Sequence, residues 1–159
     1  MNTVELELIG FTHICLRDRF LGTFAANKIP PIANIRQLKH DSCMICNTDP
    51  DYKTGSHWVA FYVNKNGVIE FFDSLNNDVD SYVHGIRDIL YDDSLHIISN
   101  KLQYQSNTSI KCGEFVLFYL DLRCQGFTFD AILDKFHSEN LPYNDKLVDT
   151  YYNKHFILK

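Results

Sequence analysis

Two short apolar runs separated by a polar turn mark the middle of the chain. Residues 57–64 and 68–73 are rich in β-branched and aromatic side chains, and Lys65-Asn66-Gly67 stands between them. An Asn-Gly pair between two such runs is a strong hairpin signal. Both runs are apolar at nearly every position, which is typical of strands buried on both faces. The pattern therefore predicts a hairpin inside a sheet.

The other periodic segments predict helices and further strands. Residues 78–91 carry apolar side chains at helical spacing, with Asp78 as the cap. Residues 112–124 are apolar almost all round, as in a helix buried in the middle of a domain, and Gly126 ends this segment. We also expect helices over 129–136, capped by Thr128, and 141–156, one or two strands over 95–105, and a buried strand at 43–46. Together they predict an α+β fold, with a central buried helix against a mainly antiparallel sheet and flanking helices.

Length and composition predict an ordinary globular protein. The chain has 159 residues, of which 45% are hydrophobic and 22% charged, enough for one real core. No apolar run approaches the roughly 18 residues that cross a bilayer. Residues 1–10 lack the basic and apolar regions of a secretory signal. We therefore expect a single domain over residues 1–159, inside the cell and without a membrane.

Charge and cysteine content narrow the function further. The net charge is −5 and no cluster of Lys and Arg stands out, which argues against nucleic-acid binding as the main function. An odd number of cysteines without a secretion signal argues against a disulfide framework. Cys43 and Cys46 have the C-x-x-C spacing of metal and redox sites, but no second pair completes a zinc site. Their apolar neighbours favour small buried side chains on a strand.

Cys112 is the candidate nucleophile. Cysteine hydrolases need a thiolate, a nearby imidazole and a third group that fixes the imidazole's tautomer. Cys112 follows a polar loop and opens the apolar helix, where free N–H groups and the helix dipole favour an anion. Gly113 leaves room for a substrate backbone to approach. On position alone, a further buried cysteine on an apolar helix stays the alternative.

The predicted hairpin brings an acid–base pair together. His57 begins its first strand and Asp73 ends its second, so the two lie roughly opposite each other, within reach of a hydrogen bond. Alternate residues of a strand share a face, so Asp73 lies on the face of Ile69 and Phe71, and Glu70 lies on the other. This alternation favours Asp73 over Glu70 as the partner of His57. Gln105 ends the last strand before the loop, and its amide could donate to an oxyanion beside the Cys112 N–H. A surface histidine beside a strand-end aspartate is the alternative.

These residues, in this order, resemble the adenain clan, which comprises the adenovirus maturation protease and the SUMO-specific proteases. The resemblance rests on GSHWVAF at 55–61, FFDSL at 71–75, and Gln105 seven residues before Cys112-Gly113. Segments 19–24 and 46–48 look like the adenoviral branch, and the likeness covers roughly residues 20–129. It implies a papain-like, adenain-like cysteine protease fold in which Cys112, His57, Asp73 and Gln105 are catalytic. By resemblance, Trp58 lines the channel for the substrate residues before the scissile bond, and together with Gly113 we expect it to contact the substrate.

The resemblance also implies a biological setting. It indicates a viral cysteine endopeptidase that cleaves capsid and core precursors during virion maturation, after small or Gly-containing sites. Its partners would be viral precursor polypeptides, and its location the virion and the cytoplasm or nucleus of the infected cell, without secretion. Related proteases occur in virophages and Polinton-type elements, and the short chain suits such a source. We expect a monomer.

Cofactor use departs from the adenoviral pattern. The chemistry itself requires no cofactor or metal. The adenoviral enzyme is activated by a disulfide-linked peptide and by DNA, so the resemblance implies a peptide or DNA activator for this protein too. Ser94 falls roughly where the linking cysteine would be, so that disulfide is not expected, and the acidic charge does not favour DNA. Asp73 also stands where the adenoviral enzyme usually has Glu, in the same role.

Two rival functions stay open. An isopeptidase that removes a SUMO-type modifier after Gly-Gly would use the same chemistry, and Phe72-Asp73-Ser74-Leu75 resembles that branch too. A capsid-binding domain on a protease-like scaffold would keep the core helix. Such a domain has little reason to retain Cys112, His57, Asp73 and Gln105 together.

Overall fold

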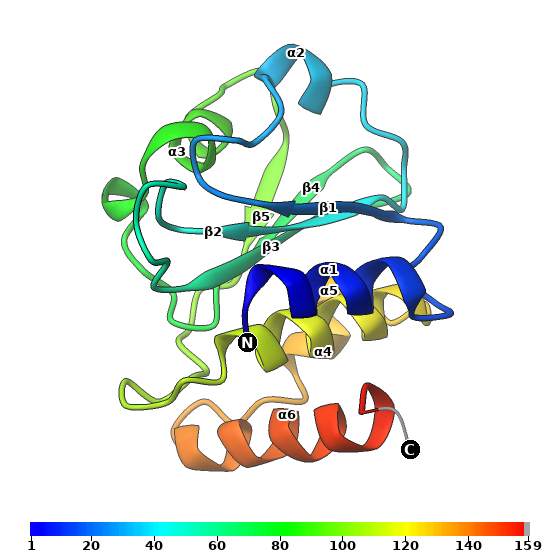
Figure 1. The fold of residues 1–159 in the computed structure, drawn as a ribbon, viewed down its shortest axis with the longest axis vertical. Coiled ribbons are helices and arrows are strands. Elements are labelled where there is room, and N and C mark those ends of the chain that lie inside the picture. The colour runs from blue at the N-terminus through cyan, green and yellow to red at the C-terminus, as the bar shows by residue number, and fades with distance from the viewer. Residues whose placement is uncertain (158–159) are drawn as a thin grey trace.

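A computed structural model describes residues 1–157 as a five-stranded sheet between two layers of helices (Figure 1). The strands follow one another across the sheet in chain order: β1 (Phe20–Phe24), β2 (Cys43–Asn47), β3 (Trp58–Val63), β4 (Ile69–Phe72) and β5 (Ile97–Ser99). The two inner pairs are antiparallel and the two outer pairs are parallel. The fold is α+β as predicted, with a mixed sheet where we expected a mainly antiparallel one.

Each face of the sheet has its own hydrophobic core. One face packs against α1 (Thr3–Thr12), α4 (Cys112–Cys124) and α5 (Phe129–Leu133), and α6 (Leu141–His155) packs on α4 on the side away from the sheet. The other packs against α2 (Ile32–Ile35), the 3-10 helix η1 (Val79–Ser81) and α3 (His84–Leu90). Alternate side chains of β3 enter the two cores: Ala60 and Tyr62 on the α4 side, Val59 and Phe61 on the α3 side. This double burial explains why the strand is apolar at every position.

The hairpin of β3 and β4 is confirmed in place and register. Ala60 lies opposite Phe72, and Val63 lies opposite Ile69. The side chain of Asn64 accepts the N–H groups of Asn66 and Val68, which closes the turn. Gly67 has φ of +76°, a left-handed conformation that glycine adopts without strain. The two strands therefore reach the same end of the sheet with their outer residues, His57 and Asp73, side by side.

Helix α4 is the centre of the molecule. It spans Cys112–Cys124 as predicted, and its apolar sides are buried under the sheet and against α6. Past its end, Gly126 has φ of +98°, which ends the helix. Glu70 of β4 reaches the far half of α4, where Arg123 donates to both carboxylate oxygens at 2.7 and 2.9 Å. This buried ion pair binds sheet to helix on the face opposite Asp73, as the alternation along the strand requires.

Several segments differ from the sequence-based expectation. The helix expected over 78–91 is split into η1 and α3, with Asp78 capping only η1. The break falls where Tyr82 turns inward to Asp73 and where Gly85 N–H donates to the carbonyl of Ala26. The helix expected over 129–136 ends at Leu133. Of the one or two strands expected over 95–105, there is one, β5. Helix α1 was not predicted, because its apolar residues are distributed around the whole helix.

The expectation about disulfides was wrong for one pair. Cys15 and Cys124 form a disulfide, with their Cα atoms 5.9 Å apart. The bond joins the loop after α1 to the end of α4, 109 residues later in the chain. Counting cysteines could not reveal it, because the two meet only through the packing of α1 beside α4.

Among residues 1–157, no helix has the length and apolarity to cross a membrane.

Candidate active site

His57 and Asp73 form a buried pair at the end of the hairpin. The Nε2 atom of His57 donates to Oδ1 of Asp73 at 2.6 Å. The ring is therefore held with its Nδ1 atom directed away from the carboxylate, and His57 also interacts with Cys112. The structure thus brings together three side chains that lie in different parts of the sequence.

Asp73 is held by a set of donors that fixes the carboxylate as an anion. Its Oδ1 also accepts the Leu75 N–H at 2.9 Å. Its Oδ2 accepts the backbone and side-chain N–H groups of Asn77, each at 3.1 Å, and the hydroxyl of Tyr82. Burial by itself would raise the pKa of Asp73, but these donors and the His57 ring outweigh it, and the pKa is lowered. Asp73 is therefore charged and faces His57 in one orientation.

The charges of His57 and Cys112 favour each other. Burial alone would lower the pKa of His57, but hydrogen bonds to Asp73 and Cys112 outweigh it and raise the pKa to about 9. Burial would raise the pKa of Cys112, but the His57 ring and the backbone N–H groups of Trp58 and Gly113 lower it instead. The thiol also opens α4, whose first-turn N–H groups favour an anion. The pair is therefore disposed to exist as thiolate and imidazolium at neutral pH.

Gln105 is fixed beside this pair. Its side-chain carbonyl accepts the Ser74 hydroxyl at 2.6 Å, and its amide donates to the Ser109 carbonyl at 2.8 Å. The residue is 2% exposed, so the amide has one orientation and one hydrogen left over. Gln105 lines the same cleft as Cys112. A side chain held in this way can act as a preorganised oxyanion donor.

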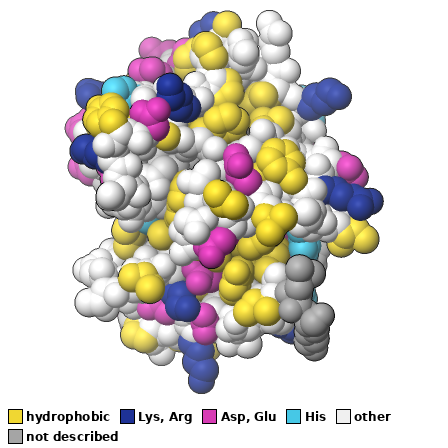
Figure 2. Space-filling view, in the orientation of Figure 1, with side chains coloured by type: hydrophobic (Ala, Val, Ile, Leu, Met, Phe, Trp, Pro, Cys, Tyr) yellow, Lys and Arg dark blue, Asp and Glu magenta, His cyan; other side chains and the backbone are white. Residues whose placement is uncertain are grey.

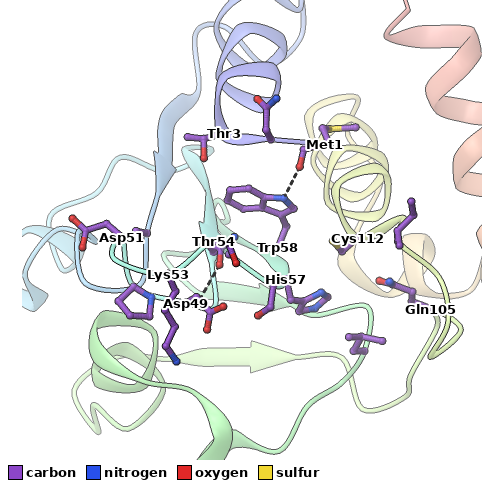
Figure 3. Close-up of a pocket in the computed structure, with 18 of the residues that line it drawn as sticks. Met1, Thr3, Asp49, Asp51, Lys53, Thr54, His57, Trp58, Gln105 and Cys112 are labelled. Atoms are coloured by element: carbon purple, nitrogen blue, oxygen red, sulfur yellow. Dashed lines mark hydrogen bonds between the residues drawn. The ribbon is translucent and has the colours of Figure 1, made fainter.

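A cleft of about 660 Å³ exposes the site to solvent (Figure 3). One arm of it is lined by the 47–58 segment together with residues 1–3, and the other by Leu75, Asn107 and Ile110. In Figure 3, Asp49, Asp51 and Lys53 lie on one side of His57 and Cys112, and Gln105 lies on the other.

The N-terminal residues form an unexpected wall of this cleft. The indole Nε1 of Trp58 donates to the Met1 carbonyl at 3.2 Å (Figure 3). A Cβ added to Gly113 would lie 3.0 Å from Cβ and Sδ of Met1. Gly113 therefore lies beneath Met1 and does not line the cleft, whereas we expected it to face the substrate. Trp58 does line the cleft.

The C-x-x-C pair is not part of the site. Cys43 and Cys46 are buried in β2, and their side chains enter the cores on opposite faces of the sheet. Burial raises the pKa of both thiols, that of Cys43 to about 12. In the described part of the chain, no three His, Cys, Asp or Glu side chains gather closely enough to hold a metal ion. The structural interpretation of the pair is the one that fits.

Several residues that position the site were missed. Asn100 exchanges hydrogen bonds with the backbone of Asp73, at 2.7 and 3.0 Å, and Ser74 and Tyr82 hold Gln105 and Asp73. Asn100 and Asp73 each come directly after a strand, β5 and β4, and these strands are parallel neighbours. Polar residues at the carboxyl ends of adjacent parallel strands could have suggested the contact. No pattern in the sequence suggested the contact of Met1 with Trp58.

Replacing Gln105 with Ala is expected to lower kcat for peptide cleavage by a factor on the order of 10² to 10³, with KM little changed, if the amide serves the oxyanion. Steady-state kinetics on a peptide substrate measures it. Ser74→Ala, which frees the Gln105 carbonyl, should give a smaller loss in kcat. Gln125→Ala, at the opposite end of α4, is the matched control and should behave as wild type. A Gln105→Ala enzyme with wild-type kcat would remove Gln105 from the mechanism.

Comparisons with known proteins add two structural likenesses. No protein-family model matches the chain, and no curated protein sequence does. The ASFV pS273R protease superposes with a TM-score of 0.47 at 20% identity, over 74% of this chain and 44% of that one. The central domain of the uncharacterized Lpg1148 protein from Legionella pneumophila gives a TM-score of 0.48 at 15% identity, over 97% and 94%. This chain thus spans less than half the length of the ASFV protein, and both likenesses concern the fold.

Proposed function

We propose that the protein is a cysteine endopeptidase with Cys112 as nucleophile, His57 as acid and base, and Asp73 as the residue that orients His57. The observation that supports this most directly is the His57 ring, which bonds the Asp73 carboxylate through Nε2 and interacts with the Cys112 thiol in an open cleft that both residues line. A buried histidine with a purely structural role has no need of a thiol at a helix N-terminus. The depressed pKa of Cys112 and the fixed amide of Gln105 support the same chemistry.

In the first half of the reaction, the Cys112 sulfur attacks the scissile carbonyl carbon and a C–S bond forms. The carbonyl electrons move to oxygen, and the oxyanion is stabilised by the Gln105 amide and the Cys112 N–H. When the intermediate collapses, the C–N bond breaks and His57 gives its proton to the leaving amine. The product is a thioester on Cys112 and a neutral His57.

In the second half, water attacks the thioester carbonyl while His57 takes a proton from it. The C–S bond then breaks, the acid product leaves, and Cys112 is again a thiolate beside a protonated His57. Asp73 keeps its charge throughout and stabilises the imidazolium in both halves. No metal or organic cofactor takes part in this scheme.

We further propose that the substrates are viral precursor polypeptides, cut during virion maturation after small or Gly-containing sequences. The adenain-type motifs around His57, Asp73 and Cys112 support a viral maturation enzyme. The preference for small residues comes from the same resemblance, in which Trp58, a lining residue of the cleft, borders the channel for the residues before the scissile bond. The virion and the infected cell are then the places where the protein acts. The adenoviral enzymes that the chain resembles are activated by a peptide and by DNA, so the test below is carried out with and without DNA.

The second candidate is an isopeptidase that cleaves a ubiquitin-like modifier after Gly-Gly. The segment Phe72-Asp73-Ser74-Leu75, which also resembles the SUMO-specific proteases, favours this candidate. The two candidates differ in what must lie before the scissile bond: a short peptide sequence for the endopeptidase, and a folded modifier for the isopeptidase.

The experiment that separates them uses one preparation of purified protein, with and without DNA. A library of proteome-derived peptides is digested and the new termini are sequenced, and in parallel a SUMO–reporter fusion and a ubiquitin–reporter fusion are incubated. We expect cleavage of unstructured peptides after small residues, and no preference for the fusions. Processing of the fusions alone would establish the isopeptidase. Cleavage of neither, with or without DNA, together with a thiol that ignores peptide electrophiles, would leave a non-enzymatic capsid-binding domain.

A further inference from the structure

Helix α1 presents large apolar side chains to solvent. Val4, Leu8 and Phe11 are 74%, 59% and 50% exposed and follow one another at helical spacing along one side of the helix. We call these three residues the α1 stripe. Figure 2 shows apolar side chains gathered over α1 and the neighbouring strand β1, next to acidic groups. Apolar groups that are contiguous at the surface mark interaction sites more often than scattered ones do.

The helix that carries the stripe is firmly placed. Its inner side buries Leu6 and Gly10. Gly10 lies so close to Phe20 that an added Cβ would be 2.3 Å from its ring. At its start, Asn2 and Glu5 form a capping box, with hydrogen bonds of 2.7 and 3.0 Å. The outward direction of the stripe is therefore a property of the fold.

The stripe continues directly from the candidate active site. Met1, Asn2 and Thr3 line the cleft, and Val4 is the next residue. Trp58, beside which we place the substrate residues before the scissile bond, bonds Met1. A substrate that leaves this arm of the cleft thus meets the first turn of α1. Val4 to Phe11 spans two helical turns, about 10 Å, which matches two turns of a partner helix.

Charge on α1 restricts the kind of partner. The helix contains Glu5 and Glu7 and no Lys or Arg, and the whole chain has a net charge of −5. A partner that presents Lys or Arg beside its apolar side chains would complement this face, whereas an anionic surface would be repelled.

We propose that the α1 stripe is an exosite for the protein substrate. It binds an amphipathic, basic helical segment that lies N-terminal to the scissile bond, and so adds affinity for substrates that carry such a segment. This rests on the proposed peptidase function, since the occupant is part of the substrate. The exosite selects among precursors by a segment outside the cleft, while the cleft selects the bond.

Two peptides test the exosite. One is a short fluorogenic peptide taken from the sites found in the library. The other is the same peptide extended at its N-terminus by a flexible Gly-Ser linker and a helix of about 14 residues, with Leu at i, i+4 and i+7 and Lys on the flanks. For the wild-type protein, we expect KM for the extended peptide to be about tenfold lower than for the short one, because the second contact is intramolecular. An extension of the same composition with the Leu positions scrambled should give no gain.

The double variant Val4→Ser/Leu8→Ser should abolish the gain and cleave the short peptide as wild type does. Tyr143→Ser, which alters a large side chain on α6 that is 51% exposed, is the matched control and should keep the gain. The exosite is overturned if the wild-type protein shows no gain, or if the gain survives Val4→Ser/Leu8→Ser. It is also overturned if the wild-type protein is a dimer that this variant turns into a monomer, because the stripe would then be a contact between copies.

A failure of the peptidase proposal is distinguishable from a failure of the exosite. If no peptide is cleaved, fluorescence anisotropy of the labelled helix alone still measures binding to the protein. Binding to the wild-type protein that is lost in Val4→Ser/Leu8→Ser would support the surface without the peptidase. Absence of binding would remove both the surface and its occupant.

Discussion

Substitution of Cys112 by Ala is expected to abolish peptide cleavage, with a loss in kcat on the order of 10⁶ or to below detection. The reason is chemical: without the sulfur no acyl-enzyme forms, and nothing else in the cleft is a nucleophile of comparable strength. The fold should survive, because Cys112 is only partly buried and Ala is a good residue for a helix. Cleavage of a library-selected peptide by wild-type and variant protein, at matched circular dichroism, measures the effect.

The matched control is Cys43→Ala. This thiol is buried in β2, its pKa is raised to about 12, and it takes no part in the proposed reaction. Cys43→Ala should therefore keep its kcat/KM, with some loss of stability from the small cavity. If Cys112→Ala retained activity while Cys43→Ala lost it, the nucleophile would have to be sought elsewhere in the chain.

Asp73→Asn is expected to lower kcat/KM by a factor on the order of 10³ and to change its pH dependence. In the wild-type protein His57 is protonated below about pH 9, so activity should fall as the pH rises through that value. The lower limit is set by protonation of Cys112, whose pKa is depressed. Asn removes the negative charge, and burial then dominates and lowers the pKa of His57. The alkaline limb of the pH profile should therefore shift to lower pH.

Geometry adds to the effect of the lost charge. Both oxygens of Asp73 accept hydrogen bonds, Oδ1 from His57 and Leu75, and Oδ2 from Asn77 and Tyr82. In Asp73→Asn, the side-chain NH₂ group takes the place of one of these oxygens in either orientation of the amide. It then faces hydrogen-bond donors and loses their bonds. Tyr82→Phe is the control: it removes one donor, leaves the charge, and should keep the alkaline limb near about pH 9. An Asp73→Asn variant with an unchanged profile would show that Asp73 does not govern the His57 proton.

The parts of the site that lie on one hairpin or one helix were predictable. The Asn66-Gly67 turn sets the register, and the register brings His57 to Asp73. The apolar run after Cys112 places the thiol at the start of α4. In both cases, short-range pattern and position along an element are enough, because few alternatives bury so many apolar residues.

The parts that depend on distant packing were not predictable. Asn100 reaches Asp73 only because β5 is parallel to β4, and a crossover through α3 hides that neighbour in the sequence. Met1 reaches Trp58 only because α1 lies beside α4, and this placement also brings Cys15 to Cys124. The apolar residues of α1 gave no clear period, since three of them face solvent instead of the core.

The most direct test of the account is covalent labelling of the wild-type protein with a Gly-containing peptide vinyl sulfone, followed by peptide mapping in the mass spectrometer. The account predicts a single adduct, on Cys112, which forms far more slowly in His57→Ala and leaves Cys43 and Cys46 unmodified. No adduct with or without DNA, an adduct on another cysteine, or an adduct on Cys112 that forms equally fast in His57→Ala would contradict it.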